Sequence, residues 1–77
     1  MAHMYFHCAS ADRVMPDREG CSLDDLSAAY GRAVASIETM IGMPNMEDWR
    51  GWKMLVLDAA DELLFEISFS SVIGRLH

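Results

Sequence analysis

Apolar and polar residues alternate near the start of the chain, and this alternation predicts antiparallel strands. In MYFHCA, residues 4–9, Phe6 and Cys8 share one face of an extended chain. RVM, residues 13–15, predicts a short second strand after a turn. Pro16 lacks an amide hydrogen and ends that strand. We therefore expect a hairpin here.

The same alternation returns in the second half of the chain. WKMLVLD, residues 52–58, and LLFEISF, residues 63–69, are separated by the turn segment DAADE. This arrangement predicts a second hairpin. One face of its second strand is entirely apolar, being formed by Leu63, Phe65, Ile67 and Phe69.

Between the hairpins the apolar period changes to that of a helix over residues 23–41. Ser22 is a good N-cap residue, and Asp25 three positions later approximates a capping box. Gly42 is suited to the C-cap, and Pro44 prevents continuation. The predicted apolar stripe contains Leu26, Tyr30, Ala33, Val34, Ile37 and Ile41.

The segment PDREGC, residues 16–21, combines residue types that serve either chemistry or a turn. Gly20 has no Cβ and allows a sharp bend. Cys21 and Leu26 occupy the two positions of a hydrophobic staple around the helix start. We interpret the segment as a structural corner between a strand and the helix.

The predicted order is β-β-α-β-β in one domain, residues 1–77. We expect an α+β fold, in which one helix covers one face of an antiparallel sheet. The covered face takes Phe6, Cys8, Phe65, Ile67 and Phe69, with either Trp52 or Leu55. Residues 1–3 are either native or a cloning remnant, and residues 71–77 either dock or fray.

The opposite face keeps leucines where an exposed sheet face is usually polar. Hydrophobic residues make up 52% of only 77 residues, more than one small core needs. A second copy of the chain is the simplest cover. We therefore predict a homodimer, with an interaction surface at Leu55, Leu57, Leu64 and the loop residue Trp49.

Charge narrows the classes of partner. The formal net charge is −6, from six basic and twelve acidic residues. Nucleic acid and anionic membranes attract clustered Lys and Arg, so we expect neither as a partner. The sequence also lacks a membrane-span pattern and a signal-peptide pattern, which favours the cytoplasm, where cysteines stay reduced.

Four motifs in this order resemble a family of short bacterial proteins that is defined only as a domain of unknown function. They are YFH, DREG, LSAAYGRAVAS and GWKMLVLDAADELLFEISF, and together they span residues 4–70. Family members usually have a Gly in the second hairpin turn, where this chain has DAADEL, and more charges on the helix. The resemblance implies a shared fold and no assigned activity.

A weaker resemblance links MPDREGCS and LDDLSAAYGRAV to HicB-type antitoxins, which pair an acidic domain with a DNA-binding tail. This chain lacks the tail, and the spacing between Gly-Cys and the helix is shorter than in those proteins. The resemblance implies an alternative function, an antitoxin-like protein that binds a toxin enzyme.

Candidate chemistry is limited to two cysteines and nearby histidines. Cys8, Cys21 and His7 have suitable types for a thiol site or a zinc site, but no CxxC or HExxH spacing joins them. His7 and Cys8 are adjacent and point to opposite faces of a strand. We therefore expect no catalytic residue, no metal and no cofactor, with the thiol or metal site kept as a further alternative.

Overall fold

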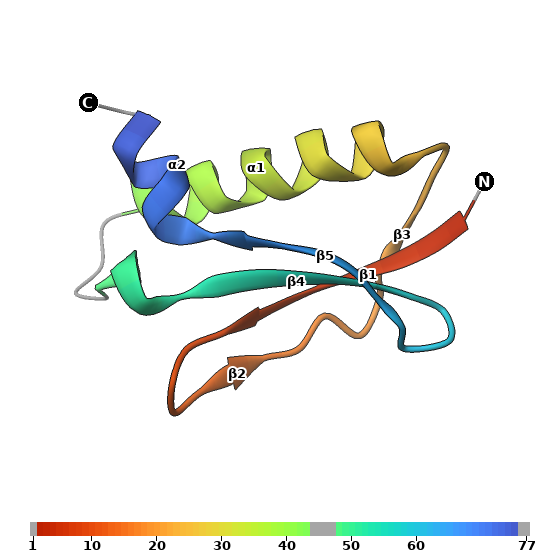
Figure 1. Ribbon diagram of the computed structural model, residues 1–77, viewed down its shortest axis with the longest axis horizontal. Helices are drawn as coiled ribbons and strands as arrows, with labels where there is room; N and C mark the ends of the chain where they lie inside the picture. The colour runs from red at the N-terminus through yellow and green to blue at the C-terminus, as the bar shows by residue number, and fades with distance from the viewer. Residues whose placement is uncertain (1, 44–47, 76–77) are drawn as a thin grey trace.

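The computed structural model describes residues 2–43 and 48–75, and it confirms a small α+β fold built on an antiparallel sheet. The strand order is β2-β1-β4-β5, and β3 pairs with β1 along the same edge as β2. Both α-helices lie on one side of the sheet (Figure 1). The elements are β1 (Ala2–Ala9), β2 (Val14–Met15), β3 (Cys21–Leu23), α1 (Leu26–Gly42), the 3₁₀ turn η1 (Trp49–Gly51), β4 (Lys53–Asp58), β5 (Leu63–Ser68) and α2 (Phe69–Arg75).

The helix entrance differs from the prediction. Cys21–Leu23 is a strand, because its backbone pairs with residues 2–4 of β1 and holds the chain extended. Ser22 is therefore not the N-cap. Asp25 takes that role, and its carboxylate accepts a hydrogen bond from the Ala28 N–H at 2.8 Å. The corner joins two strands rather than a strand and a helix.

The helix also turns a different face to the sheet than the apolar stripe indicated. Ala29, Ala33 and Ile37 are fully buried. Leu26 and Tyr30, which the stripe placed in the core, are 53% and 42% exposed. Small alanines form the seam because they let α1 lie close to the strands, and the larger residues of the stripe are displaced to the side.

The core lies between the sheet and the two helices. Trp52, not Leu55, shares the covered face, and Phe6 and Phe65 are partly buried there. The segment after β5 docks, because α2 supplies Phe69 and Val72 to the core. The buried residues are Met4, Cys8, Ala29, Ala33, Ile37, Trp52, Met54, Val56, Ile67, Phe69 and Val72.

An aromatic cluster anchors α2. The Trp49 ring stacks on Phe69 at 5.5 Å and contacts Trp52 at 5.3 Å between centroids. Ser70 Oγ donates a 2.7 Å hydrogen bond to the Arg50 carbonyl. These contacts fix η1 and α2 against each other at one end of the sheet.

Candidate functional site

The two edges of the sheet are the most distinctive parts of the molecule, and the first is the β1 edge. β2 pairs with Cys8 and Ala9, and β3 pairs with Ala2 through Met4, which leaves a gap in the ladder between them. The DREG segment bridges this gap. The Phe6 N–H lies in the gap and donates a 3.1 Å hydrogen bond to Asp17 Oδ2. The Asp17 carboxylate thus takes the place of a carbonyl group from a neighbouring strand.

The same carboxylate organises its own loop. Asp17 Oδ1 accepts hydrogen bonds from the N–H groups of Glu19 and Gly20, at 3.1 and 3.0 Å. An aspartate that bonds backbone two and three residues later is typical of a turn. Partial burial alone would raise the pKa of Asp17, but the N–H groups of Gly20, Phe6 and Glu19 lower it below its ordinary value.

Two histidines on the outer face of β1 form hydrogen bonds with the DREG loop. The Asp17 N–H donates to His7 Nδ1 at 2.9 Å, so Nδ1 carries no proton in this arrangement. His3 Nε2 donates to the Glu19 carbonyl at 2.8 Å. Tyr5 lies between the two imidazoles and contacts both rings. The histidines therefore have structural partners.

Gly20 has a left-handed backbone that explains why glycine stands there. Its φ is +65°, and a Cβ at this position would lie 2.6 Å from the Met4 carbonyl oxygen and 2.7 Å from His3 Nε2. Any larger residue would push the loop away from β1. The segment is a turn, as predicted, but it leads into β3 and not into the helix.

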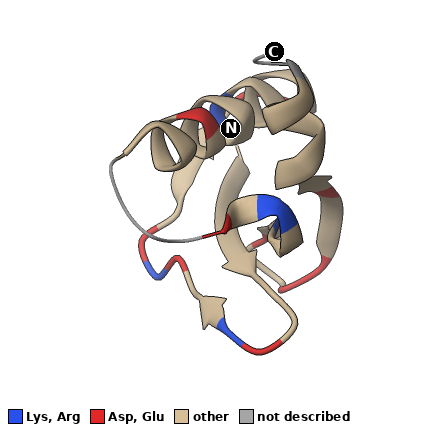
Figure 2. Ribbon diagram, turned by 90° about the vertical axis from the view of Figure 1, so that its left-hand side faces the viewer, with Lys and Arg blue, Asp and Glu red and all other residues tan. Residues whose placement is uncertain are grey.

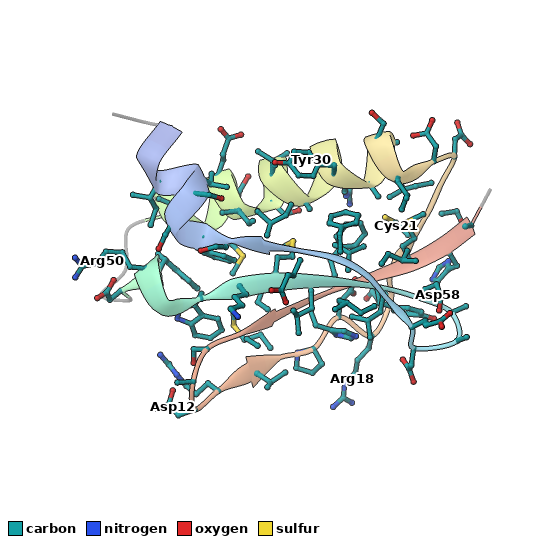
Figure 3. The ribbon with its side chains drawn as sticks, in the orientation of Figure 1. Asp12, Arg18, Cys21, Tyr30, Arg50 and Asp58 are labelled. Atoms are coloured by element: carbon teal, nitrogen blue, oxygen red, sulfur yellow. The ribbon has the colours of Figure 1, made fainter. Side chains whose placement is uncertain are left out.

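The two thiols and His7 do not form one site. Cys8 and Cys21 line the same cavity of about 310 Å³ beneath α1, whereas His7 bonds the loop on the other face of β1. Cys21 pairs with Met4, which is four residues from Cys8, or roughly 13 Å along the strand. A disulfide needs Cα atoms within about 7 Å, so the two cysteines cannot bridge. Figure 3 shows Cys21 at the β3 end of this space.

Cys8 lies among sulfur atoms rather than beside a base. Its Sγ is 3.9 Å from Met40 Sδ, and Met54 is its direct neighbour on β4. Burial and, second to it, the nearby Asp17 charge raise the pKa of Cys8 to about 11. The protonated thiol is a weak nucleophile. Within the described ranges no three His, Cys, Asp or Glu side chains are grouped to hold a metal ion.

The second edge of the sheet is β5, which pairs only with β4 in the part of the chain that the structure describes. Phe69 N–H donates to the Trp52 carbonyl, and the register continues through Met54–Ile67 and Val56–Phe65. Backbone groups alternate in direction along an antiparallel strand. The N–H and C=O groups of Glu66 and Ser68 therefore point away from β4.

Exposed apolar side chains follow this edge. Leu63 is 53% exposed and Leu64 is 37% exposed. α1 runs in the same direction as β5 (Figure 1), and the Tyr30 ring contacts Phe65 at 6.0 Å between centroids. Leu63 pairs with Leu57 across the irregularity in the β4–β5 register, so it lies towards the outer sheet face, whereas Leu26 and Tyr30 belong to α1 on the other side of the sheet. We call Leu26, Tyr30, Leu63 and Leu64 the β5 strip.

The four predicted interaction residues are divided by the structure. Leu55 and Leu57 lie on the outer sheet face and are half-buried by their neighbours. Leu64 belongs to the β5 strip, at the irregularity between Val56 and Leu57 in the β4–β5 register. Trp49 packs in the aromatic cluster with Phe69 and is not beside the leucines.

Charges lie mostly outside the strands. Figure 2 shows red and blue chiefly in turns and loops, with the strand ribbons mostly tan. On the outer face Lys53 and Glu66 approach each other at 3.9 Å. Arg18 in the DREG loop points away from the sheet (Figure 3). No helix in the described ranges is long and apolar enough to cross a membrane.

Comparison with known proteins agrees with the motifs that the structure has explained. A family model, Domain of unknown function (DUF6894), matches residues 3–70. The chain belongs to this family. The DUF6894 match includes the structures at both edges of the sheet, namely the DREG loop and β5. No curated protein and no solved structure matches the chain.

Sequence reasoning missed the role of Asp17, because that role depends on which backbone N–H groups the carboxylate binds in the folded chain. Asp17 follows Pro16 and precedes Gly20 by three residues, which is a turn signal that was available. Its bond to Phe6 was not available, because only the register of β1 between β2 and β3 creates the gap that the carboxylate fills.

Proposed function

We propose that this domain is a non-enzymatic protein-interaction module that forms a homodimer. The observation that carries the proposal is the open β5 edge with the β5 strip beside it, four large apolar side chains of α1 and β5 that remain exposed. Exposed apolar side chains beside an unpaired strand edge are typical of an interaction surface.

The distribution of charge supports a second copy as the occupant. Each chain has a formal net charge of −6, so a contact between two copies is favoured only where acids are scarce. β5 has one acid, Glu66, and Lys53 of the adjacent strand lies beside it. Interface cores are generally depleted of charged residues and enriched in aromatic ones, as here with Tyr30.

The cysteines support the non-enzymatic part of the proposal. The raised pKa of Cys8 keeps that thiol protonated near neutral pH. Cys21 is half-buried and lies beyond reach of a disulfide with Cys8. We expect slow alkylation of both thiols by iodoacetamide in the folded protein. Rapid alkylation of Cys21 would instead favour the thiol-site alternative.

The test of self-association is the absolute mass of untagged protein, measured by light scattering up to tens of micromolar. We expect twice the chain mass of 8.6 kDa. Leu63→Lys should shift the mass towards the monomer. Val14→Lys is the matched control, because Val14 is an apolar residue, 65% exposed, at the opposite edge.

A steady monomer at every concentration would overturn the homodimer. The β5 strip would then be assigned to a different protein, as the antitoxin-like alternative requires. Loss of the dimer in Val14→Lys, with the dimer kept in Leu63→Lys, would also contradict the proposal, because it would move the contact to the β1 edge.

A further inference from the structure

We infer that two copies join edge to edge, with β5 of one chain antiparallel to β5 of the other and Phe65 on the two-fold axis. The inference rests on the proposed homodimer and specifies its interface. β5 has six residues and pairs only with β4 among the described residues. It has the outward backbone groups of Glu66 with exposed apolar side chains beside them, as strand addition requires.

The backbone favours the edge over the outer face. Glu66 directs its N–H and C=O groups away from β4, where a second strand can bond them, whereas the outward Ser68 carbonyl already accepts a hydrogen bond from Ser71 Oγ. Leu55 and Leu57, the predicted face residues, are already half-buried within the chain. Beside the edge the exposed fractions are larger, from 37% to 53%, at Leu26, Tyr30, Leu63 and Leu64.

Two alternative registers are unfavourable, one because of charge and the other because it leaves apolar side chains exposed. Residues directly opposite in an antiparallel pair lie on the same face, so an axis through Glu66 would place the two Glu66 carboxylates against each other, which is unfavourable. An axis through Ile67 would bring the start of α2 into the pairing and leave Leu63 and Leu64 uncovered.

An axis through Phe65 avoids both problems. It places Leu64 opposite Glu66 of the second copy, while Leu63, which pairs with Leu57 beyond the irregularity in the β4–β5 register, lies outside the regular pairing. The two Phe65 residues then face each other, and aromatic pairs across strands are favourable. Tyr30 lies over Phe65, so the two Tyr30 rings flank the axis and extend the contact from the sheet to the helices.

A cross-linking experiment reads this register directly. Phe65→Cys and Glu66→Cys are each made in a Cys21→Ser background, oxidised mildly and separated on non-reducing gels. We expect a disulfide-linked dimer from Phe65→Cys and none from Glu66→Cys, whose two Cα atoms would lie ~8 Å apart. Cross-linking of Glu66→Cys instead would overturn the register.

A second pair of variants tests the edge without removing a core side chain. Glu66→Pro removes an outward N–H but none of the bonds to β4, and proline is tolerated at a sheet edge. We expect its dimer dissociation constant to rise on the order of 100-fold, since one bond is lost from each copy. Glu66→Gln keeps the N–H and should stay dimeric.

The outcomes separate the two proposals. A monomeric wild type would overturn the homodimer and this interface together. A dimeric wild type with a dimeric Glu66→Pro and no Phe65→Cys cross-link would overturn only the edge. Circular dichroism of Glu66→Pro at low concentration confirms that its monomer is folded, so that a change in mass reports the contact.

Discussion

The two edges of this sheet differ in whether their outward backbone groups are already hydrogen-bonded. At the β1 edge, β2, β3 and the Asp17 carboxylate leave no backbone N–H between Met4 and Cys8 open to another strand. At the β5 edge, Glu66 and Ser68 have outward backbone groups and apolar neighbours. Proteins usually protect exposed edges against unwanted pairing. The proposed dimer uses the edge that is left unprotected.

The largest effect should come from removing the glycine that closes the β1 edge. Gly20→Ala puts a Cβ 2.6 Å from the Met4 carbonyl oxygen in a left-handed backbone. We expect a loss of about 3 kcal/mol or more in the free energy of unfolding, measured with urea. A small domain with that loss is largely unfolded.

Gly31→Ala is the control for that variant. Gly31 lies in α1, and a Cβ there meets no atom within 4 Å. Because alanine favours a helix, this variant should be more stable by up to ~1 kcal/mol. Equal stability of the two variants would mean that the DREG loop does not depend on contact with β1.

A smaller effect is expected from the carboxylate that fills the gap. Asp17→Asn leaves three N–H groups with a weaker acceptor, and we expect a loss of ~1.5–3 kcal/mol at pH 7 in urea unfolding. Glu38→Gln changes an exposed carboxylate on α1 and should stay within ~0.5 kcal/mol of wild type.

The pH dependence of the Asp17 effect has a definite sign. The folded pKa of Asp17 is below its ordinary value, so its carboxylate stabilises the fold above the unfolded pKa of ~3.9. That stabilisation is lost as the pH falls through the folded pKa. The difference between wild type and Asp17→Asn should shrink below about pH 4, and a difference that grows there would contradict the assignment.

The smallest effect concerns the hairpin that presents the open edge. Asp61 has a φ of +63°, a backbone that favours glycine, and lies in the turn between β4 and β5. Asp61→Gly should raise the free energy of unfolding by ~0.5–1 kcal/mol in urea. Asp61→Ala keeps a Cβ and should give no gain. The mass of the dimer should not change in either variant.

The period of the apolar residues was sufficient to predict the main helices and strands of this fold. It was insufficient where strand pairing determines the end of an element. The alternation around Phe6 and Ile67 and the helical period through Ile37 predicted both hairpins and α1 correctly. Ser22 is an equally good cap by residue type, but pairing of β3 with β1 assigns the cap to Asp25. Local sequence contains no information about such a competitor.

The candidate site was likewise predicted in part. Surplus hydrophobicity predicted an uncovered apolar surface, and Leu64 lies in the β5 strip. Leu26 and Tyr30 were assigned to the core, because a helical stripe does not reveal which part of it extends beyond the sheet. Trp49 was assigned to a contact loop, although α2, which the sequence left undecided, supplies Phe69 as its stacking partner.

The aromatic cluster gives the protein an internal optical reporter. Of the two tryptophans of the chain, Trp49 stacks on Phe69, the first residue of α2, and Trp52 contacts the Trp49 ring. Intrinsic tryptophan fluorescence therefore follows the docking of α2 at one end of the sheet. Changes confined to the open edge or to the DREG loop would leave that emission unchanged, so fluorescence and mass report independent events in one sample.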